Sequence, residues 1–218
     1  PRSNTVEDEM HIAFFFFFTP PITGAELVPI QFLQELSSLD KDNHYSIFLS
    51  QEHRDIIGHD APNLNVITYD DIWSNSIGSI LWHQLLLPLA VRRYNIDVLY
   101  TVQNRIPVIK NCPQIVSVLD LADCRVERKY DALRNIYRTL LFKTVVPRAD
   151  RVVTISESSG RDIEEFLHIP EERIDVIHLG VGDEYFADVT KQVARQYVAT
   201  RLHLPNRYIL YVGAIEHP

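Results

Sequence analysis

Short apolar runs alternate with helical patterns along almost the whole of this chain, and this alternation most constrains its fold. Residues 11–18 form a continuous apolar run of strand length that ends at a Thr-Pro-Pro sequence. Runs of this kind are typical of strands buried on both faces of a sheet. Apolar residues then recur at helical spacing from Leu27 to Leu36. The first forty residues therefore predict a strand, a loop and a helix.

The same order repeats through the rest of the chain. Further strands are expected at 45–49, 66–68, 98–101, 115–118, 152–155, 174–178 and 208–212, and further helices at 76–93, 125–145, 156–168 and 191–202. Strands separated by helices of ten or more residues pair in parallel, with right-handed crossovers. The predicted fold class is α/β, a Rossmann-like doubly wound parallel sheet with helices on both faces. Ligands in such folds bind at the carboxyl ends of the strands.

The length is generous for one domain and short for two complete ones. The chain has 218 residues, of which 46% are apolar and 23% charged, so a disordered or fibrous chain is excluded. We expect a tail at 1–10 and an N-terminal domain at 11–187. A linker and helix at 188–206 should then lead into the first strand of a second domain at 207–218, whose remainder is missing from the chain.

The charge distribution argues against a nucleic-acid partner. The net charge is -8, whereas nucleic-acid binding needs a clustered basic surface. Only 111–151 is basic, with eight Lys and Arg against five Asp and Glu. Its predicted helix face carries Arg128, Lys129, Arg134 and Arg138. This face could hold an anionic acceptor or make a peripheral contact with an anionic membrane, although a solvated helix face is the simpler interpretation.

Cysteine usage and hydropathy predict a cytoplasmic protein. Cys112 and Cys124 form neither a CxxC pair nor a disulfide framework, and the acidic N-terminus does not resemble a signal peptide. Residues 73–91 carry no Asp, Glu, Lys or Arg but hold too many Ser, Asn, His and Gln side chains for a membrane span. We expect a mostly buried helix there.

Familiar catalytic motifs are mostly absent. The only GxG sequence starts at Gly180 and has no third glycine, and there is no P-loop, GxSxG or HExxH sequence. No two of the nine histidines form a chelating pair with a third ligand, so no metal site is expected. The loop at 20–26 remains, because Gly24 before a helix would let a phosphate approach the helix N-terminus. A structural glycine turn is the alternative.

Six motifs in order resemble a known family. In chain order they are WHQ at 82–84 with Leu87-Pro88, DVLY at 97–100, VLDL at 118–121, ADRVVTISESS at 149–159, IPEERI at 169–174 followed by Gly180-Val181, and YILYVG at 208–213. Together they are similar to the N-terminal half of retaining glycosyltransferases of the GT-B class, the group 1 glycosyl transferases. They cover nearly the whole chain and are specific to the family rather than to one substrate.

The resemblance implies a function and a set of site residues. It implies transfer of a sugar, with retention, from a nucleotide-sugar donor to a saccharide or glycolipid acceptor, without a metal or other cofactor. Asp120 is the catalytic residue carried over. Thr23, Gly24, Gly213, Ser156 and Gly180 are the expected donor and acceptor contacts. Because the family holds the donor mainly in its second domain, this chain alone is expected to be inactive.

Three departures from the family pattern concern the sugar subsite. Thr23 stands where the family has a first glycine, Leu119 replaces its histidine, and Leu179 replaces the asparagine of an Asn-Gly-Val turn. Two alternatives stay open. The chain could be a non-catalytic module that binds a nucleotide or a protein, or part of a sugar-nucleotide epimerase of the same architecture.

Overall fold

The computed structural model describes most of the chain. The described residues are 9–16, 24–58, 60–73, 76–102, 106–121, 140, 142–182, 188–205 and 207–211. They divide between two compact units, Pro1–Leu179 and Gly180–Pro218. The predicted helix at 125–145 lies largely outside the described residues, as do Thr23 and Gly213.

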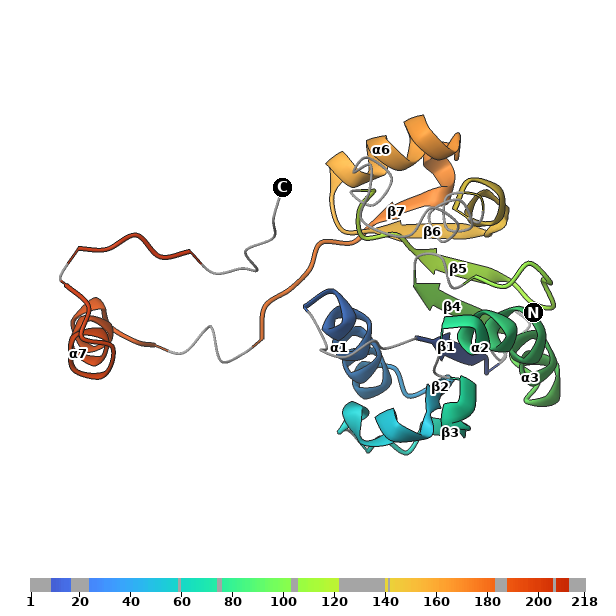
Figure 1. Cartoon of the computed structure of the whole chain (residues 1–218), viewed down its shortest axis with the longest axis horizontal. Helices are drawn as coiled ribbons and strands as arrows, with labels where there is room; N and C mark the ends of the chain where they lie inside the picture. The colour runs from blue at the N-terminus through green and yellow to red at the C-terminus, as the bar shows by residue number, and fades with distance from the viewer. Residues whose placement is uncertain are drawn as a thin grey trace, which may run out of the picture. The chain divides into compact units, whose positions relative to one another are not determined.

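The first unit contains a seven-stranded parallel sheet (Figure 1). Its strands are β1 (His11–Phe15), β2 (His44–Ser50), β3 (Leu64–Tyr69), β4 (Val98–Val102), β5 (Gln114–Ser117), β6 (Arg151–Thr154) and β7 (Ile174–Val176). The strand order is β3-β2-β1-β4-β5-β6-β7. The chain thus winds outward from β1 in one direction and from β4 in the other. The predicted doubly wound fold is confirmed.

Helices cover both faces of this sheet (Figure 1). They are α1 (Gly24–Leu39), α2 (Ser76–Leu81), the π-helix η3 (Trp82–Leu86), α3 (Leu87–Arg93) and α6 (Glu157–Leu167), with short 3₁₀ helices η1 (Gln51–Ile57), η2 (Asp71–Trp73), η5 (Val146–Arg148) and η6 (Glu171–Arg173). The predicted helix at 76–93 is therefore three consecutive helical segments. The short 3₁₀ helices have no apolar periodicity and were not expected from the sequence.

Alternating side chains of β1 divide the core between the two faces. Phe14 packs with Ile30 and Leu33 of α1, whereas Phe15 packs with Trp82 and Leu87 on the opposite face. This follows from the period of two along a strand, and it explains why residues 12–15 of β1, with helices on both sides, are all apolar. The continuous apolar run in the sequence therefore reports the central position of β1.

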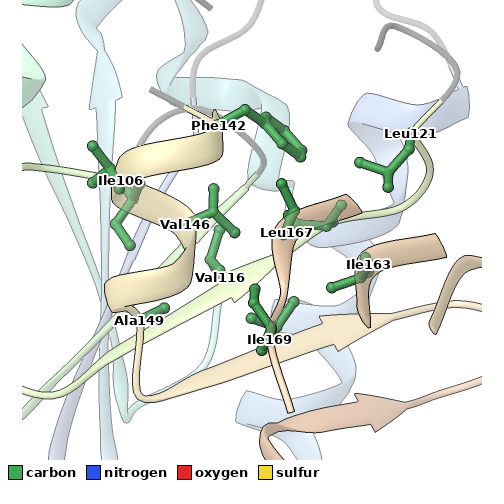
Figure 2. Close-up of a cluster of buried hydrophobic side chains, with 12 residues drawn as sticks. Ile106, Val116, Leu121, Phe142, Val146, Ala149, Ile163, Leu167 and Ile169 are labelled. Atoms are coloured by element: carbon green, nitrogen blue, oxygen red, sulfur yellow. The ribbon is translucent and has the colours of Figure 1, made fainter. Parts of the chain in front are cut away.

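A third cluster fills the sheet side around β5 and β6. Figure 2 shows Ile163 and Leu167 of α6 directed toward Ile169 and Val116, with Val146 of η5 beside them. All five side chains are at most 5% exposed. This cluster holds the second half of the sheet to α6.

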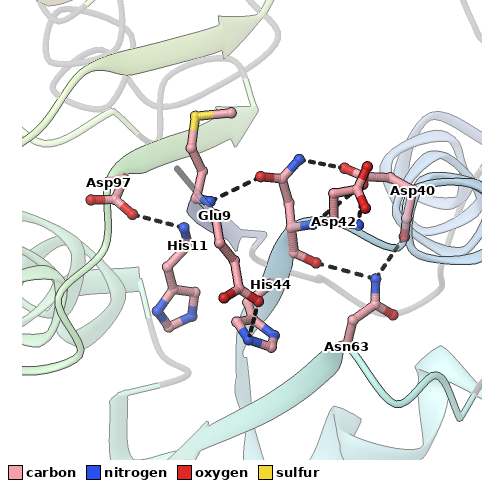
Figure 3. Close-up of polar contacts among 9 residues, drawn as sticks. Glu9, His11, Asp40, Asp42, His44, Asn63 and Asp97 are labelled. Carbon is pink, nitrogen blue, oxygen red and sulfur yellow. Dashed lines mark hydrogen bonds and ion pairs between the residues drawn. The ribbon is translucent and has the colours of Figure 1, made fainter. Parts of the chain in front are cut away.

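Polar side chains tie the amino edge of the sheet together (Figure 3). The His11 backbone N–H donates to Asp97, the Met10 N–H donates to Asn43, and the Asn43 amide donates to Asp40 at 2.7 Å. The Tyr45 hydroxyl also donates to Asp40. The Tyr45 and Asn43 bonds to the Asp40 carboxylate lower its pKa to about 2. The network connects β1, β2, β4 and the end of α1.

The second unit has little regular structure among its described residues. It contains α7 (Lys191–Arg201), which has no buried residue. Residues 207–211 are exposed and form no strand, so the strand expected at 208–212 is not present in the part of it that the structure describes. A strand needs a neighbour for its backbone hydrogen bonds. The second domain expected from this segment stays a prediction.

None of the helices that the structure describes combines the length and the apolar character that crossing a bilayer requires.

Candidate functional site

The carboxyl edge of the parallel sheet is the candidate site. All seven strands end there, and the winding direction reverses between β1 and β4, the place where such folds bind ligands. The residues that follow these two strands, 17–23 and 103–105, lie outside the described residues. The described part of this edge consists of the ends of the other strands, among them β2, β5 and β6, and the start of α1.

Two helices begin at this edge. α1 has 16 residues and starts at Gly24 in the connection after β1, and α6 has 11 residues and starts directly after β6. The first N–H groups of a helix lack partners within it, and the helix dipole adds partial positive charge at the same end. The edge therefore presents N–H donors suited to an anion.

Asp120 lies just beyond the end of β5. The backbone N–H of Val118 still donates to Val153 at 2.8 Å, and Leu119 and Leu121 are 6% and 3% exposed. Asp120 between these two buried leucines is exposed. The buried neighbours fix the backbone on both sides, so the carboxylate is held at the carboxyl edge of the sheet.

Ser156 caps α6. Its Oγ accepts a hydrogen bond from the Ser159 N–H at 3.1 Å and lies 3.0 Å from the Ser159 hydroxyl. An N-cap side chain satisfies one of the free donors of the first turn. The helix expected at 156–168 therefore begins at this cap, while the predicted ligand contact of Ser156 stays a prediction.

Gly180 is the first residue of the second unit, so it is described apart from the strand ends. A Cβ at this position would meet nothing within 4 Å. Leu179 before it is 51% exposed. Neither residue is required by packing among the described residues, and the predicted binding role of Gly180 stays a prediction.

A polar cluster at the end of β2 was missed by the sequence analysis. Ser50 Oγ lies 2.6 Å from His53 Nδ1, and Glu52 Oε1 lies 3.5 Å from the same nitrogen. Asp71 accepts a hydrogen bond from the Glu52 N–H at 3.0 Å. In the sequence, the contact corresponds only to a Ser three residues before a His. This spacing does not indicate a contact unless the chain turns at the strand end, as it does in η1.

The motif at 82–84 has structural roles. Trp82 stacks on Tyr69 with ring centroids 4.2 Å apart and on Phe15 at 5.1 Å. Buried His83 has Nδ1 2.6 Å from the carbonyl oxygen of Ser79. The Gln84 amide bonds the Ile106 carbonyl at 3.2 Å and the Val108 N–H at 2.9 Å.

The described residues include no cluster of metal-ligating side chains and one half-buried thiol, that of Cys112. No three His, Cys, Asp or Glu side chains gather closely enough to hold a metal ion among the described residues. Burial raises the pKa of the half-buried Cys112 thiol to about 11, so this thiol stays protonated at neutral pH.

Comparison with known proteins identified one family and a curated relative. The family model described as Glycosyltransferase Family 4 matches residues 22–185. A D-inositol 3-phosphate glycosyltransferase of Thermobispora bispora is 37% identical over 81 residues, which cover 36% of this chain and 18% of that protein.

Solved structures share the fold at low sequence identity. A glycosyltransferase from Rickettsia africae is 16% identical with a TM-score of 0.55, and the match covers 91% of this chain and 50% of that one. HepE of Anabaena, solved with UDP, is 15% identical with a TM-score of 0.56 over 89% and 50% of the two chains. A UDP-glucose:anthocyanidin 3-O-glucosyltransferase, also solved with UDP, is 12% identical with a TM-score of 0.57 over 88% and 58%. This chain thus spans about half the length of these structures.

Proposed function

The chain belongs to glycosyltransferase family 4, and from this membership we propose that it forms the acceptor-side domain of an enzyme that transfers a sugar from a nucleotide-sugar donor. The observation that carries the proposal is the family match over 22–185, which includes the start of α1, Asp120 and the cap of α6. This chain covers about half of each of these similar solved structures, which supports the proposal that it is one domain of a larger enzyme.

A nucleoside diphosphate sugar is the proposed donor. Two proteins with the same fold, HepE and the anthocyanidin glucosyltransferase, were solved with UDP. When the sugar leaves such a donor, negative charge grows on the diphosphate. The N-termini of α1 and α6 at the carboxyl edge supply N–H donors and dipole for that charge. We therefore propose that the reaction needs no metal or other cofactor.

Asp120 is the proposed catalytic residue of this domain. The transition state of glycosyl transfer resembles an oxocarbenium ion, and an exposed carboxylate near the reacting sugar can accept hydrogen bonds from its hydroxyls. Leu119, where the family has a histidine, is buried and leaves Asp120 as the polar side chain of this turn. Retention of the anomeric configuration follows from the family resemblance and is part of the proposal.

The acceptor is proposed to be a saccharide or a glycolipid. The curated relative is named for transfer to an inositol phosphate, so that cyclitol phosphate is a first compound to test. Thr23, Gly24, Ser156, Gly180 and Gly213 remain proposed contacts of the donor and acceptor.

The test is a transfer assay with UDP- and GDP-sugars in the presence of EDTA. The assay compares this chain with a longer protein that contains the whole of its sequence. We expect the longer protein to form product with EDTA present, with the donor's anomeric configuration by NMR, and this chain to show no turnover. Normal turnover by this chain alone would contradict the need for a second domain. Formation of an epimerised nucleotide sugar in the absence of an acceptor would show that the enzyme is an epimerase and not a transferase.

Substitution Asp120→Asn tests the proposed catalytic residue. We expect kcat/KM of the active protein to fall about 10²-fold or more, the range for loss of one positioned catalytic group. Glu164→Gln, an exposed carboxylate within α6, is the matched control and should leave kcat/KM unchanged. Equal rates for Asp120→Asn and the unmodified protein would remove Asp120 from the reaction.

A further inference from the structure

An exposed apolar stripe runs along the helical segment formed by α2, η3 and α3. Ile77, Leu81, Leu85 and Leu89 recur every four residues and are 71%, 43%, 54% and 61% exposed. The opposite side of this segment, with Trp82, Leu87 and Val91, packs into the core. The expectation of a mostly buried helix is therefore wrong for one side of it.

The π-helix keeps the stripe straight. On an α-helix, residues four apart drift by about 40° around the axis. The wider turn of η3 holds more residues and takes up part of this drift between Leu81 and Leu85. Four apolar side chains consequently share one side over the length of three helical segments.

A neighbouring loop widens this surface. The Val108 N–H donates to the side-chain oxygen of Gln84, and the Asn111 amide donates to the Pro88 carbonyl at 2.7 Å. Val108 and Ile109 are 41% and 51% exposed beside the helix. The stripe and this loop together make an exposed apolar face larger than the scattered single residues that are normal on a protein surface.

Opposite charges lie at the two ends of the stripe. Arg92 and Arg93 follow Leu89 by three and four residues and are exposed. At the other end, η2 packs against the first turn of α2, since a Cβ on Gly78 would lie 2.9 Å from the Trp73 Cα. This contact places exposed Asp70 and Asp71 at that end. The helical segment itself, 76–91, has no Asp, Glu, Lys or Arg.

We propose that this face binds a second copy of the chain with the two helical segments antiparallel. A two-fold axis across the stripe would bring Arg92 and Arg93 of one copy beside Asp70 and Asp71 of the other, twice per dimer. Such an interface is self-complementary, as two-fold symmetry requires. The four apolar side chains of the stripe supply the apolar centre of the interface, and the charges at its rim set the antiparallel direction of the two helical segments. An anionic bilayer fits less well, because the two aspartates would face it.

The first test measures the oligomeric state by sedimentation velocity over a concentration series. We expect the unmodified chain to form dimers and Leu85→Glu to raise the dimer dissociation constant about tenfold or more. Leu39→Glu is the matched control, because Leu39 is 79% exposed at the end of α1 and should leave the dimer intact. An unmodified chain that stays monomeric at all concentrations, or equal effects of both substitutions, would overturn the proposal.

A charge exchange tests the antiparallel direction. One variant carries Arg92→Asp and Arg93→Asp, and the other carries Asp70→Arg and Asp71→Arg. Each alone should dimerise at least about tenfold more weakly, because like charges meet, while an equimolar mixture should form heterodimers. A mixture no better than its components would overturn the antiparallel arrangement.

Folding of each variant is checked by circular dichroism, because Asp70 and Asp71 also accept backbone hydrogen bonds. If the variant with Asp70→Arg and Asp71→Arg does not fold, the variant with Arg92→Asp and Arg93→Asp is used alone. Unchanged dimerisation of this arginine variant would contradict the proposed charge pairing. Pelleting of a monomeric chain with anionic vesicles would assign the face to lipid instead.

Discussion

His11 illustrates how the amino edge of the sheet favours one protonation state of a side chain. Its Nδ1 donates to the Tyr94 carbonyl at 3.1 Å, because a carbonyl can only accept, and its Nε2 lies 2.8 Å from the hydroxyl of fully buried Ser46. Burial lowers the pKa of His11, and His44 across the strand pair lowers it further. The Tyr94 carbonyl and Asp97 act in the opposite direction. The folded protein therefore favours the neutral ring.

This lowered pKa predicts a loss of stability in acid. The unfolded chain takes up the His11 proton near pH 6.5, before the folded chain does, so the free energy of unfolding falls as the pH drops below that value. We expect the urea midpoint to fall less between pH 7.5 and 5 in His11→Gln than in the unmodified chain. His44→Gln is the control for the exposed neighbour. The same pH dependence in His11→Gln and the unmodified chain would contradict the prediction.

Two glycines predict opposite responses to alanine. A Cβ at Gly78 would lie 2.9 Å from the Trp73 Cα and 3.1 Å from two backbone oxygens, so η2 would have to move. We expect Gly78→Ala to lower the free energy of unfolding by about 1–3 kcal/mol. A Cβ at Gly160 would lie 3.4 Å from a Val176 methyl group, an ordinary contact. Gly160→Ala should be neutral or stabilising by up to about 1 kcal/mol. Denaturant unfolding measures both, and equal losses would contradict the packing around Gly78.

At the scale of elements, α6 depends on its cap and on one apolar side. Ile163 and Leu167 are buried on that side, while the first turn relies on Ser156. The helix ends at His168, whose left-handed φ of 55° lets its N–H donate to the Glu164 carbonyl. The burial sets which side of the helix faces the sheet, and the cap sets where the helix starts.

Removal of the cap should cost stability without changing the fold. We expect Ser156→Ala to lower the free energy of unfolding by about 0.5–2 kcal/mol, because the Ser159 N–H loses its acceptor. Ser158→Ala, one exposed residue of the same helix, should change it by less than about 0.5 kcal/mol. Thermal or urea unfolding distinguishes the two. A neutral Ser156→Ala would mean that water replaces the cap fully.

At the scale of the whole molecule, the two units differ in what they bury. The first unit contains three apolar clusters on the two faces of its sheet. The second unit has one described helix, α7, with no buried residue. An 11-residue helix without packing is marginal in water. Stability is therefore concentrated in the sheet.

Hydrogen exchange should show this difference directly. We expect the amides of α7 to exchange at close to unprotected rates, while amides in the middle of β1 and β4 exchange only through global unfolding. Mass spectrometry of the exchanged chain after pepsin digestion measures both regions. Strong protection of α7 would show that this helix packs against an apolar surface.

The first seven predicted strands were all found, because runs such as 11–18 and 45–49 reflect burial on both sheet faces. The helix at 76–93 was also found, but its exposed side was not foreseen. Apolar periodicity shows that a segment has a side to bury and cannot show whether another element covers it. Ile77 and Leu85 look like core residues in the sequence and lie at the surface.

Site residues divide in the same way. Asp120 and Ser156 could be placed at strand ends from the sequence, since each directly follows an apolar run. The Ser50–His53 contact could not, because it depends on the turn of η1. The bond between His11 and Asp97 joins residues 86 positions apart and depends on the pairing of β1 with β4.

Local patterns of apolar residues and short motifs were enough to predict the α/β class, the positions of the first seven strands along the chain and the family. The spatial strand order, the exposed side of the helical segment at 76–93 and the polar groups that meet at the two edges of the sheet became known from the folded structure. These depend on pairing between distant segments, and no local pattern records which distant segment supplies the partner.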